Sequence, residues 1–292
     1  MSATPERLLW DALVLPLPQA GDAWRRWRAS ADLDHLDPAS FHLLPALAAR
    51  MPAWIGDDPK QAVLLGICRR AWSQNQLRRQ LLAQALEVLT AAGIDRVAAT
   101  GPLLWAEQYW PEGAIRPVGS VDLLMEPASV RAALHAMSTA GWIVVDPVPA
   151  GNQFHFAPGV RLRSSEGDEV RVHWRALPNT DFSLRRPEPP PLQKPGAIPR
   201  EYSLVAALGG DLQDAVGWQY DALMICATGL DWKPVAALLR PRSVARTRLD
   251  RLRREWSAEI PPWVTRPVWW NGIERILASA LRIYRRRRAV RS

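Results

Sequence analysis

The sequence predicts an α+β protein in which a small mixed sheet with packed helices is flanked by helical regions at both ends. Three observations support this fold class. Helical patterning fills residues 1–93 and returns over residues 201–292. Short β-like runs alternate with helical segments over residues 94–180, which we take as the central α/β core. A proline-dense stretch without apolar periodicity marks residues 181–200 as a linker.

The N-terminal region is expected to form helices whose ends carry suitable residues. Asp37 suits the N-cap of one helix, and Asp58 suits the N-cap of the next. Gly93 suits the C-terminal stop of this second, long helix. The expected helices cover residues 5–14, 38–50 and 59–92.

The central core is expected to alternate strands with helices, and the C-terminal region to be helical again. The expected strands cover residues 96–99, 121–125, 142–145, 154–156, 160–163 and 169–174. The expected helices of the core cover residues 102–109 and 127–140. Beyond the linker, helices are expected over residues 211–227, 233–239, 243–256 and 268–288.

The composition argues against several classes of protein. Hydrophobic residues make up 48% of the 292-residue chain, which is enough for a core and argues against wholesale disorder. Cys68 and Cys226 are the only cysteines, so a disulfide framework is not indicated and a reducing compartment fits best. The N-terminal residues lack the features of a secretory signal, and no apolar stretch is long enough to cross a bilayer. We therefore expect a cytoplasmic protein without a transmembrane segment.

The basic residues, almost all arginine, give a net charge of +8, which could attract phosphate-bearing partners. Residues 268–288 combine an apolar stripe with tryptophans and end in four consecutive arginines. Such a helix can contact an anionic membrane or dock on the protein core, and the helical spacing of its apolar residues favours docking. No nucleic-acid recognition motif accompanies the arginines, so nucleic acid is not the expected partner.

Short motifs in the central core carry the candidate chemistry. Two carboxylates at positions i and i+2 of a strand point to the same face, and a third from a neighbouring strand can complete a site for divalent cations. A glycine-containing turn nearby lets backbone N–H groups approach phosphate. The relevant motifs, in chain order, are Gly93-Ile94, Thr100-Gly101, Tyr109, Arg116, GSVDLLM at 119–125 and VRVHW at 170–174.

In order and approximate spacing, these motifs resemble the uncharacterised nucleotidyltransferase family of bacterial proteins, within the polymerase-β-like superfamily. That family has a Gly-Ile turn, a Lys-Gly pair, a Tyr, an Arg before Asp-Ile-Asp-Leu-Leu-Val, and a Val-Asp-Leu-His-Trp strand. Asp221 and the Asp231-Trp232 pair also resemble the family's tryptophan–aspartate helix and its Asp-Trp turn. The resemblance covers most of the chain and is most specific over residues 93–174. It implies a nucleotidyltransferase-type sheet that binds a nucleoside triphosphate with Mg²⁺.

This sequence departs from the family pattern at three positions. Thr100 stands where the family has lysine, Ser120 at the first Asp of the Asp-x-Asp pair, and Arg171 at the Asp of the later strand. Only Asp122 remains of the three carboxylates that the resemblance implies. A serine hydroxyl is a weak neutral ligand, whereas an arginine repels the cation or replaces its charge. The resemblance therefore implies a degenerate member of the family, in which binding of Mg²⁺ is in doubt.

Glu169 is the nearest candidate to replace a lost carboxylate. On a strand it shares one face with Arg171 and His173, but its Cβ is displaced from that of Arg171 by about 6–7 Å along the strand. We take Asp122 as the candidate catalytic residue, and Asp122 with Glu169 as candidate metal ligands. The candidate nucleotide-binding residues are Thr100, Gly101, Arg116, Gly119, Ser120, Arg171 and His173.

Simpler roles remain open for three of these residues. Arg116 could form an ordinary salt bridge, and His173 could be a hydrogen-bonded strand residue. Arg171 could be a solvated strand residue or could bind a phosphate through two hydrogen bonds.

Three functions follow as alternatives. The favoured one is a nucleotidyltransferase-family protein with impaired or absent transfer that retains a cleft for a nucleotide, a peptide or a protein partner. The second is an active metal-dependent nucleotidyltransferase in which Asp122 and Glu169 converge. The third is a non-enzymatic accessory protein of a biosynthetic or modification cluster, with its partner on the Trp-rich helices.

Overall fold

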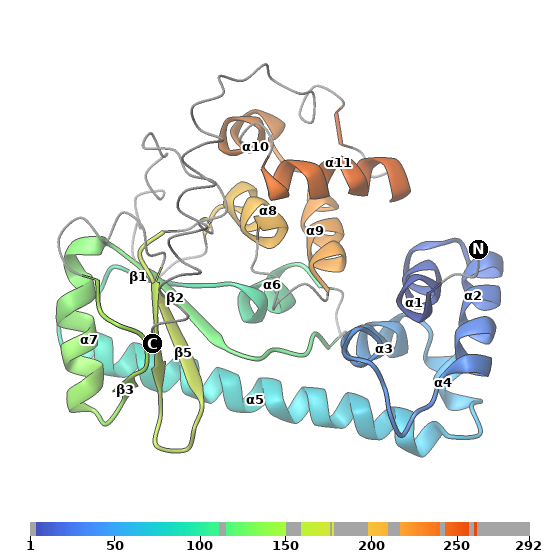
Figure 1. Ribbon diagram of the computed structural model, residues 1–292, viewed down its shortest axis with the longest axis horizontal. Helices are drawn as coiled ribbons and strands as arrows, with labels where there is room; N and C mark the ends of the chain where they lie inside the picture. The colour runs from blue at the N-terminus through green and yellow to red at the C-terminus, as the bar shows by residue number, and fades with distance from the viewer. Residues whose placement is uncertain are drawn as a thin grey trace, which may run out of the picture.

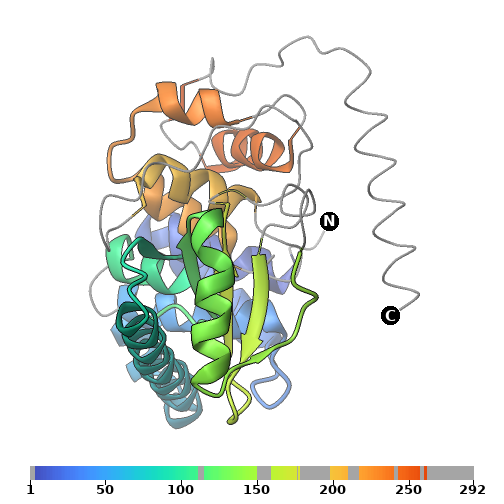
Figure 2. The same cartoon turned by 90° about the vertical axis from the view of Figure 1, so that its left-hand side faces the viewer.

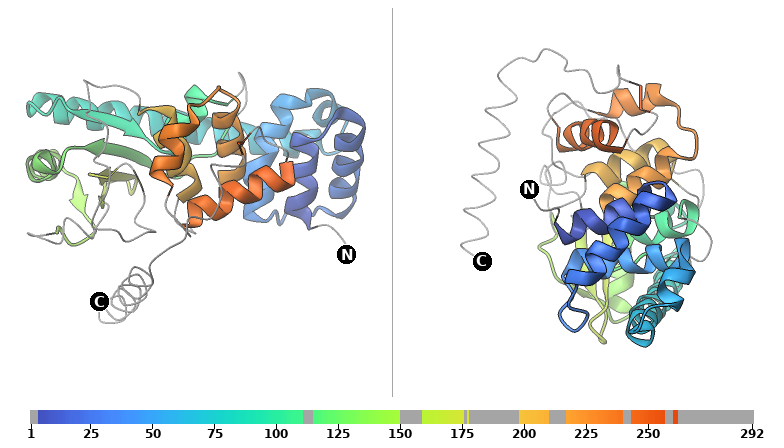
Figure 3. Two further views of the ribbon diagram at one scale, coloured as in Figure 1. Left: turned by 90° about the horizontal axis from the view of Figure 1, so that it is seen from above. Right: turned by 90° about the vertical axis from the view of Figure 1, so that its right-hand side faces the viewer.

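The computed structural model describes residues 4–110, 115–149, 159–175, 177, 198–209, 217–239, 243–256 and 260–261. Within these ranges, helical regions flank one five-stranded mixed sheet, which confirms the α+β fold class expected from the sequence (Figure 1). The long helix α5 (Gln61–Ala91) runs from the N-terminal helices to the sheet. Seen from above, the C-terminal helices lie between these two ends (Figure 3).

The N-terminal helices pack around buried tryptophans. They are α1 (Pro5–Val14), α2 (Leu17–Ser30), α3 (Pro38–Arg50) and α4 (Pro52–Gly56). The rings of Trp24 and Trp27 stack with their centroids 5.2 Å apart, and Trp10 belongs to the same core. The expected helices 5–14 and 38–50 are confirmed. Helix α2 was not among the individual helices that we expected, although the whole N-terminal region was expected to be helical.

The predicted caps explain where two helices begin and end. Asp37 Oδ1 accepts a hydrogen bond from Ser40 N at 2.9 Å, as expected of the N-cap of α3. Asp58 Oδ1 accepts from Lys60 N at 2.8 Å, so it closes the turn before α5, which begins at Gln61 instead of residue 59. Gly93, at φ +73°, follows the end of α5 as predicted.

The sheet has the strand order β1-β2-β5-β4-β3, in which β2 and β5 are parallel and the other neighbours antiparallel. The strands are β1 (Val97–Thr100), β2 (Val121–Met125), β3 (Ile143–Val144), β4 (Gly159–Arg163) and β5 (Glu169–His173). Each lies within one residue of an expected strand or inside it. The sixth expected strand, 154–156, lies outside the described residues.

The two faces of the sheet differ in chemistry. Alternate strand residues, among them Leu123, Val170 and Val172, are fully buried against α5 and α7 (Val130–Thr139). A short 3₁₀ helix, η1 (Pro127–Ser129), leads into α7, so the expected helix 127–140 forms in two parts. In Figure 2, α7 (green) lies in front of the sheet with its axis roughly along the strands. The other face carries polar side chains and holds the candidate site.

The C-terminal helices form a separate apolar cluster with α6, which follows β1. These helices are α6 (Pro102–Gln108), α8 (Arg200–Gly209), α9 (Trp218–Cys226), α10 (Trp232–Leu238) and α11 (Val244–Trp256). Where it is described, the C-terminal region is helical as expected, although α8 was not among the individual helices that we expected. Residues 210–216, most of the linker and the expected helix 268–288 lie outside the described residues. None of the described helices combines the length and apolar character that crossing a bilayer requires.

Candidate functional site

The strand register brings four polar residues into one line across the sheet. Thr100 on β1 pairs with Asp122 on β2, Asp122 pairs with Arg171 on β5, and Arg171 pairs with Arg161 on β4. We call these four residues the polar row. Paired residues on adjacent strands project to the same face, so the row crosses the face opposite to α5 and α7.

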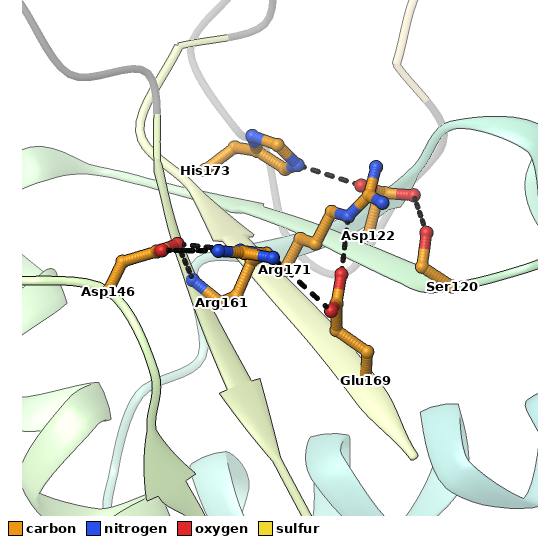
Figure 4. A network of polar contacts seen from close by, with 7 residues as sticks. All are labelled: Ser120, Asp122, Asp146, Arg161, Glu169, Arg171 and His173. Atoms are coloured by element: carbon orange, nitrogen blue, oxygen red, sulfur yellow. Dashed lines mark hydrogen bonds and ion pairs between the residues drawn. The ribbon is translucent and has the colours of Figure 1, made fainter. Parts of the chain in front are cut away.

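Asp122 lies at the centre of a small hydrogen-bonded group. His173 Nε2 lies 2.8 Å from Asp122 Oδ1, and because a carboxylate accepts hydrogen bonds, the imidazole donates from Nε2. The Ser120 hydroxyl donates to the other oxygen, Oδ2, at 3.3 Å. The Asp122 side chain is only 8% exposed, and its two oxygens face different partners (Figure 4). The structure therefore brings Ser120, Asp122 and His173 together, and their role in a functional site stays a prediction.

The turn after β1 closes against the same carboxylate. Gly101 has φ +76° and ψ −163°, a region that is essentially restricted to glycine. A Cβ at this position would lie 2.8 Å from Asp122 Oδ2, so the close approach also requires glycine. Gly119, just before β2, has open space where a Cβ would stand. Of the two predicted glycines, Gly101 therefore lies against the carboxylate, whereas Gly119 has open space beside it.

Arg171 and Glu169 lie next to Asp122 but form a different set of contacts. Arg171 Nε donates to Glu169 Oε1 at 2.9 Å, and Arg161 Nη1 lies 3.9 Å from Glu169 Oε2. Asp146 holds Arg161 from the other side, with Nη2 to Oδ1 at 2.7 Å. The hydrogen bond from Arg161 lowers the pKa of Asp146, and the same contact raises the pKa of Arg161. Glu169 therefore turns towards the arginines, as Figure 4 shows.

Arg116 belongs to another cluster altogether. Its guanidinium forms a buried ion pair with Asp221 of α9, with Nη2 to Oδ2 at 2.7 Å. Trp110 Nε1 donates to the same carboxylate at 2.9 Å. This is the ordinary salt bridge that the sequence left open for Arg116. These contacts do not test the expected role of Arg116 in nucleotide binding, which stays a prediction.

Sequence reasoning missed two residues of the polar face. Arg161 could have been placed there by applying strand alternation to the expected strand 160–163, since it stands directly between the buried residues Val160 and Leu162. Asp146 had no such signal, because it follows β3 and reaches Arg161 only through the β3–β4 pairing.

The residues around Asp122 do not fit a pair of magnesium ions. Magnesium requires octahedral oxygen ligation, usually with more than one carboxylate when two ions are bound. Asp122 supplies one carboxylate, His173 supplies a nitrogen, and Glu169 is paired with arginine. In the part of the chain that the structure describes, no three His, Cys, Asp or Glu side chains come together in a group that could hold a metal ion.

Comparison with known proteins identifies the family. No curated protein matches the chain. The family described as "Uncharacterised nucleotidyltransferase" matches residues 36–200, which is more than half of the sequence and includes all five strands and the polar row. The resemblance that the motifs indicated is thereby confirmed, and the chain belongs to the uncharacterised nucleotidyltransferase family.

Proposed function

We propose that this member of the nucleotidyltransferase family lacks metal-dependent nucleotidyl transfer and uses the polar face of its sheet to bind a nucleotide. The observation that carries the proposal is the register pair between Asp122 and Arg171. At the place where a second carboxylate would face the cation, the chain presents a guanidinium. The site is therefore suited to an anion and poorly suited to two divalent cations.

Electrostatics supports this choice. Two unit charges 4 Å apart interact by about 4 kcal/mol at an effective dielectric constant of about 20. A guanidinium beside Asp122 therefore cancels most of the attraction that this one carboxylate could offer to a cation. The same guanidinium attracts phosphate, which arginine binds through two parallel hydrogen bonds. Arg171 would then take over the neutralising role of the metal.

The remaining candidate residues have complementary roles in this proposal. Thr100 and Ser120 offer hydroxyl groups, and the backbone at Gly101 and Gly119 can approach a phosphate closely. His173 holds Asp122 through Nε2 and thereby fixes the carboxylate on the sheet. The buried pair of Arg116 with Asp221 positions the segment that leads into β2.

Two measurements on the 292-residue chain test the proposal. When the chain is incubated with labelled nucleoside triphosphates and Mg²⁺ or Mn²⁺, it should transfer no more label than the Asp122→Ala variant does. Calorimetry should detect binding of a nucleotide in the presence of EDTA. Metal-dependent transfer that Asp122→Ala abolishes would establish the active enzyme with rearranged carboxylates instead.

The same calorimetry separates nucleotide binding from a purely accessory role. A protein that only binds a peptide or protein partner would show no affinity for any common nucleotide, with or without a metal ion. That result would overturn the proposal and leave the interaction function. The exposed indole of Trp72 on α5 would then be the first side chain to replace in partner-binding experiments.

A further inference from the structure

Two arginines face each other directly on adjacent strands of the open sheet face. Arg161 on β4 and Arg171 on β5 are register partners in the antiparallel pair. Like charges directly opposite one another destabilise a sheet, because their Cβ atoms lie only about 4.5–5.5 Å apart. An anion placed between the two guanidinium groups removes this repulsion.

A carboxylate of the chain itself occupies that position. Glu169 accepts a hydrogen bond from Arg171 Nε at 2.9 Å through Oε1, and its Oε2 lies 3.9 Å from Arg161 Nη1. The second distance is too long for a hydrogen bond, so Glu169 satisfies one arginine and approaches the other only loosely. Figure 4 shows the carboxylate of Glu169 next to both arginine side chains.

Asp146 orients Arg161 towards this place. It accepts from Arg161 Nε and Nη2, at 3.0 and 2.7 Å, and from the Arg161 backbone N–H at 3.0 Å. These contacts use one edge of the guanidinium and direct Nη1 towards Glu169. Arg161 is thus held by its own carboxylate partner, independently of Glu169.

We propose that Arg161 and Arg171 form a phosphate-binding pair and that Glu169 is its internal occupant, which a phosphate group of the ligand displaces. The inference rests on the proposed nucleotide-binding function. It specifies which side chains bind the phosphates of the nucleotide and which carboxylate pairs with the arginines before the nucleotide binds. The several oxygens of a phosphate group can accept hydrogen bonds from both guanidinium groups, whereas the Glu169 carboxylate accepts a hydrogen bond from only one of the two, Arg171.

Exposure makes the exchange physically reasonable. The side chains of Arg161, Arg171 and Glu169 are 45%, 29% and 21% exposed, so their ion pairs are partly screened by solvent and weak. Arg163 lies directly opposite Glu169 in the register and offers the displaced carboxylate another guanidinium. Glu169 therefore competes with an incoming phosphate without forming a barrier to it.

The test measures binding of inorganic tripolyphosphate to the full chain by calorimetry in EDTA. Glu169→Gln removes the competing charge, and its affinity should rise about fivefold, the factor that corresponds to one exposed ion pair of about 1 kcal/mol. Arg171→Ala should lower the affinity, and Glu169→Gln should give no gain in an Arg171→Ala background. Glu126→Gln is the matched control, because it makes the same charge change at an exposed pair with Arg96.

The outcomes separate this inference from the proposed function. A fivefold gain that disappears in the Arg171→Ala background supports the internal-occupant arrangement. If the gain equals that of Glu126→Gln, or survives Arg171→Ala, the effect is general charge and the inference is wrong, even where nucleotides bind the unaltered chain. If neither the unaltered chain nor Glu169→Gln binds nucleotides or tripolyphosphate, the proposed function fails as well.

Discussion

Arg116 and Asp221 form a buried, two-pronged ion pair between segments 105 residues apart in the sequence, with Nε to Oδ1 and Nη2 to Oδ2 distances of 2.7 Å. Trp110 Nε1 donates to the same carboxylate, and Asn75 Nδ2 of α5 donates to the Arg116 carbonyl at 2.7 Å. The pair therefore joins α5, the segment before β2 and helix α9. Because the segment that carries Arg116 leads into β2, the pair supports the strand that carries Asp122.

Asp221→Ala should destabilise the fold strongly. The Asp221 side chain is completely buried, and its loss leaves the Arg116 charge buried without its partner. Removing one member of a buried ion pair typically costs about 3–5 kcal/mol. Urea unfolding followed by circular dichroism measures this loss. Glu126→Ala, which breaks the exposed pair with Arg96, is the control and should cost at most about 1 kcal/mol. Similar losses in the two variants would show that the buried pair does not support the fold.

His42 should make stability depend on pH near neutrality. Burial lowers the pKa of His42 below its ordinary value of 6.5, and the nearby Arg116 charge lowers it further. As the pH falls below 6.5, the unfolded chain therefore binds a proton at this residue before the folded chain does. The contribution of neutral His42 to the free energy of unfolding is therefore fully present above pH 6.5 and decreases as the pH falls below it.

Unfolding experiments between about pH 7.5 and about pH 5 measure the contribution of His42. His42→Gln cannot titrate, so its stability should fall less over this range than that of the unaltered chain. In Asp221→Asn, loss of the carboxylate that favours protonation should move the pKa of His42 still lower, as followed by NMR titration. A His42 pKa at or above 6.5 in the folded chain would refute the argument.

Gly101→Ala should disturb both the backbone and Asp122. The backbone conformation of Gly101 is essentially restricted to glycine, and a side chain there costs about 1–3 kcal/mol. The new Cβ would also press on Asp122 Oδ2 at 2.8 Å. Gly93→Ala provides the matched control, because Gly93 has a similar φ of +73° but no atom within 4 Å of a Cβ. Thermal unfolding should therefore show a larger loss for Gly101→Ala, and nucleotide affinity should fall only in that variant. Equal effects would mean that contact with Asp122 adds nothing.

The sequence predicted those elements whose signals are local. Helices α1 and α3 begin and end as expected, because proline and a capping residue mark their starts. Strand β2 also has its expected bounds, because five successive buried residues form it. Helix α2 lacks such a signal, because its N-cap, Pro16, makes no side-chain hydrogen bond.

The residues of the candidate site that strand alternation places on one face could be predicted from the sequence. Those that are placed by contacts between distant segments could not. Ser120, Asp122 and His173 come together because β2 and β5 are neighbouring strands, as the motifs predict; that the two strands run parallel was not predicted. The partner of Arg116 could not be derived from spacing, since Asp221 comes from a helix beyond the linker. The contact of Glu169 with two arginines depends on the register of β4 and β5, which no single segment specifies.

Restoring the lost carboxylates should give the sheet a metal site. Ser120→Asp would place an acid at position i of the i, i+2 pair with Asp122, and Arg171→Asp would place another opposite Asp122 on β5. The double variant should bind Mn²⁺ at least about tenfold more tightly than the unaltered chain, as measured by calorimetry. Because three carboxylates repel one another without a cation, Mn²⁺ should also raise the Tm of this variant.

The control for that experiment makes the same change in charge away from the site. Thr139→Asp with Arg131→Asp makes the equivalent change in charge on exposed positions of α7, which packs on the opposite face of the sheet. Residues 131 and 139 lie about 12 Å apart along the helix, so their carboxylates cannot share an ion. If this control gains as much Mn²⁺ affinity as the Ser120 and Arg171 double variant, the gain reflects net charge. If only the site variant gains affinity, the register of β2 and β5 has the geometry of a metal site, and Ser120 and Arg171 are the residues that withhold it.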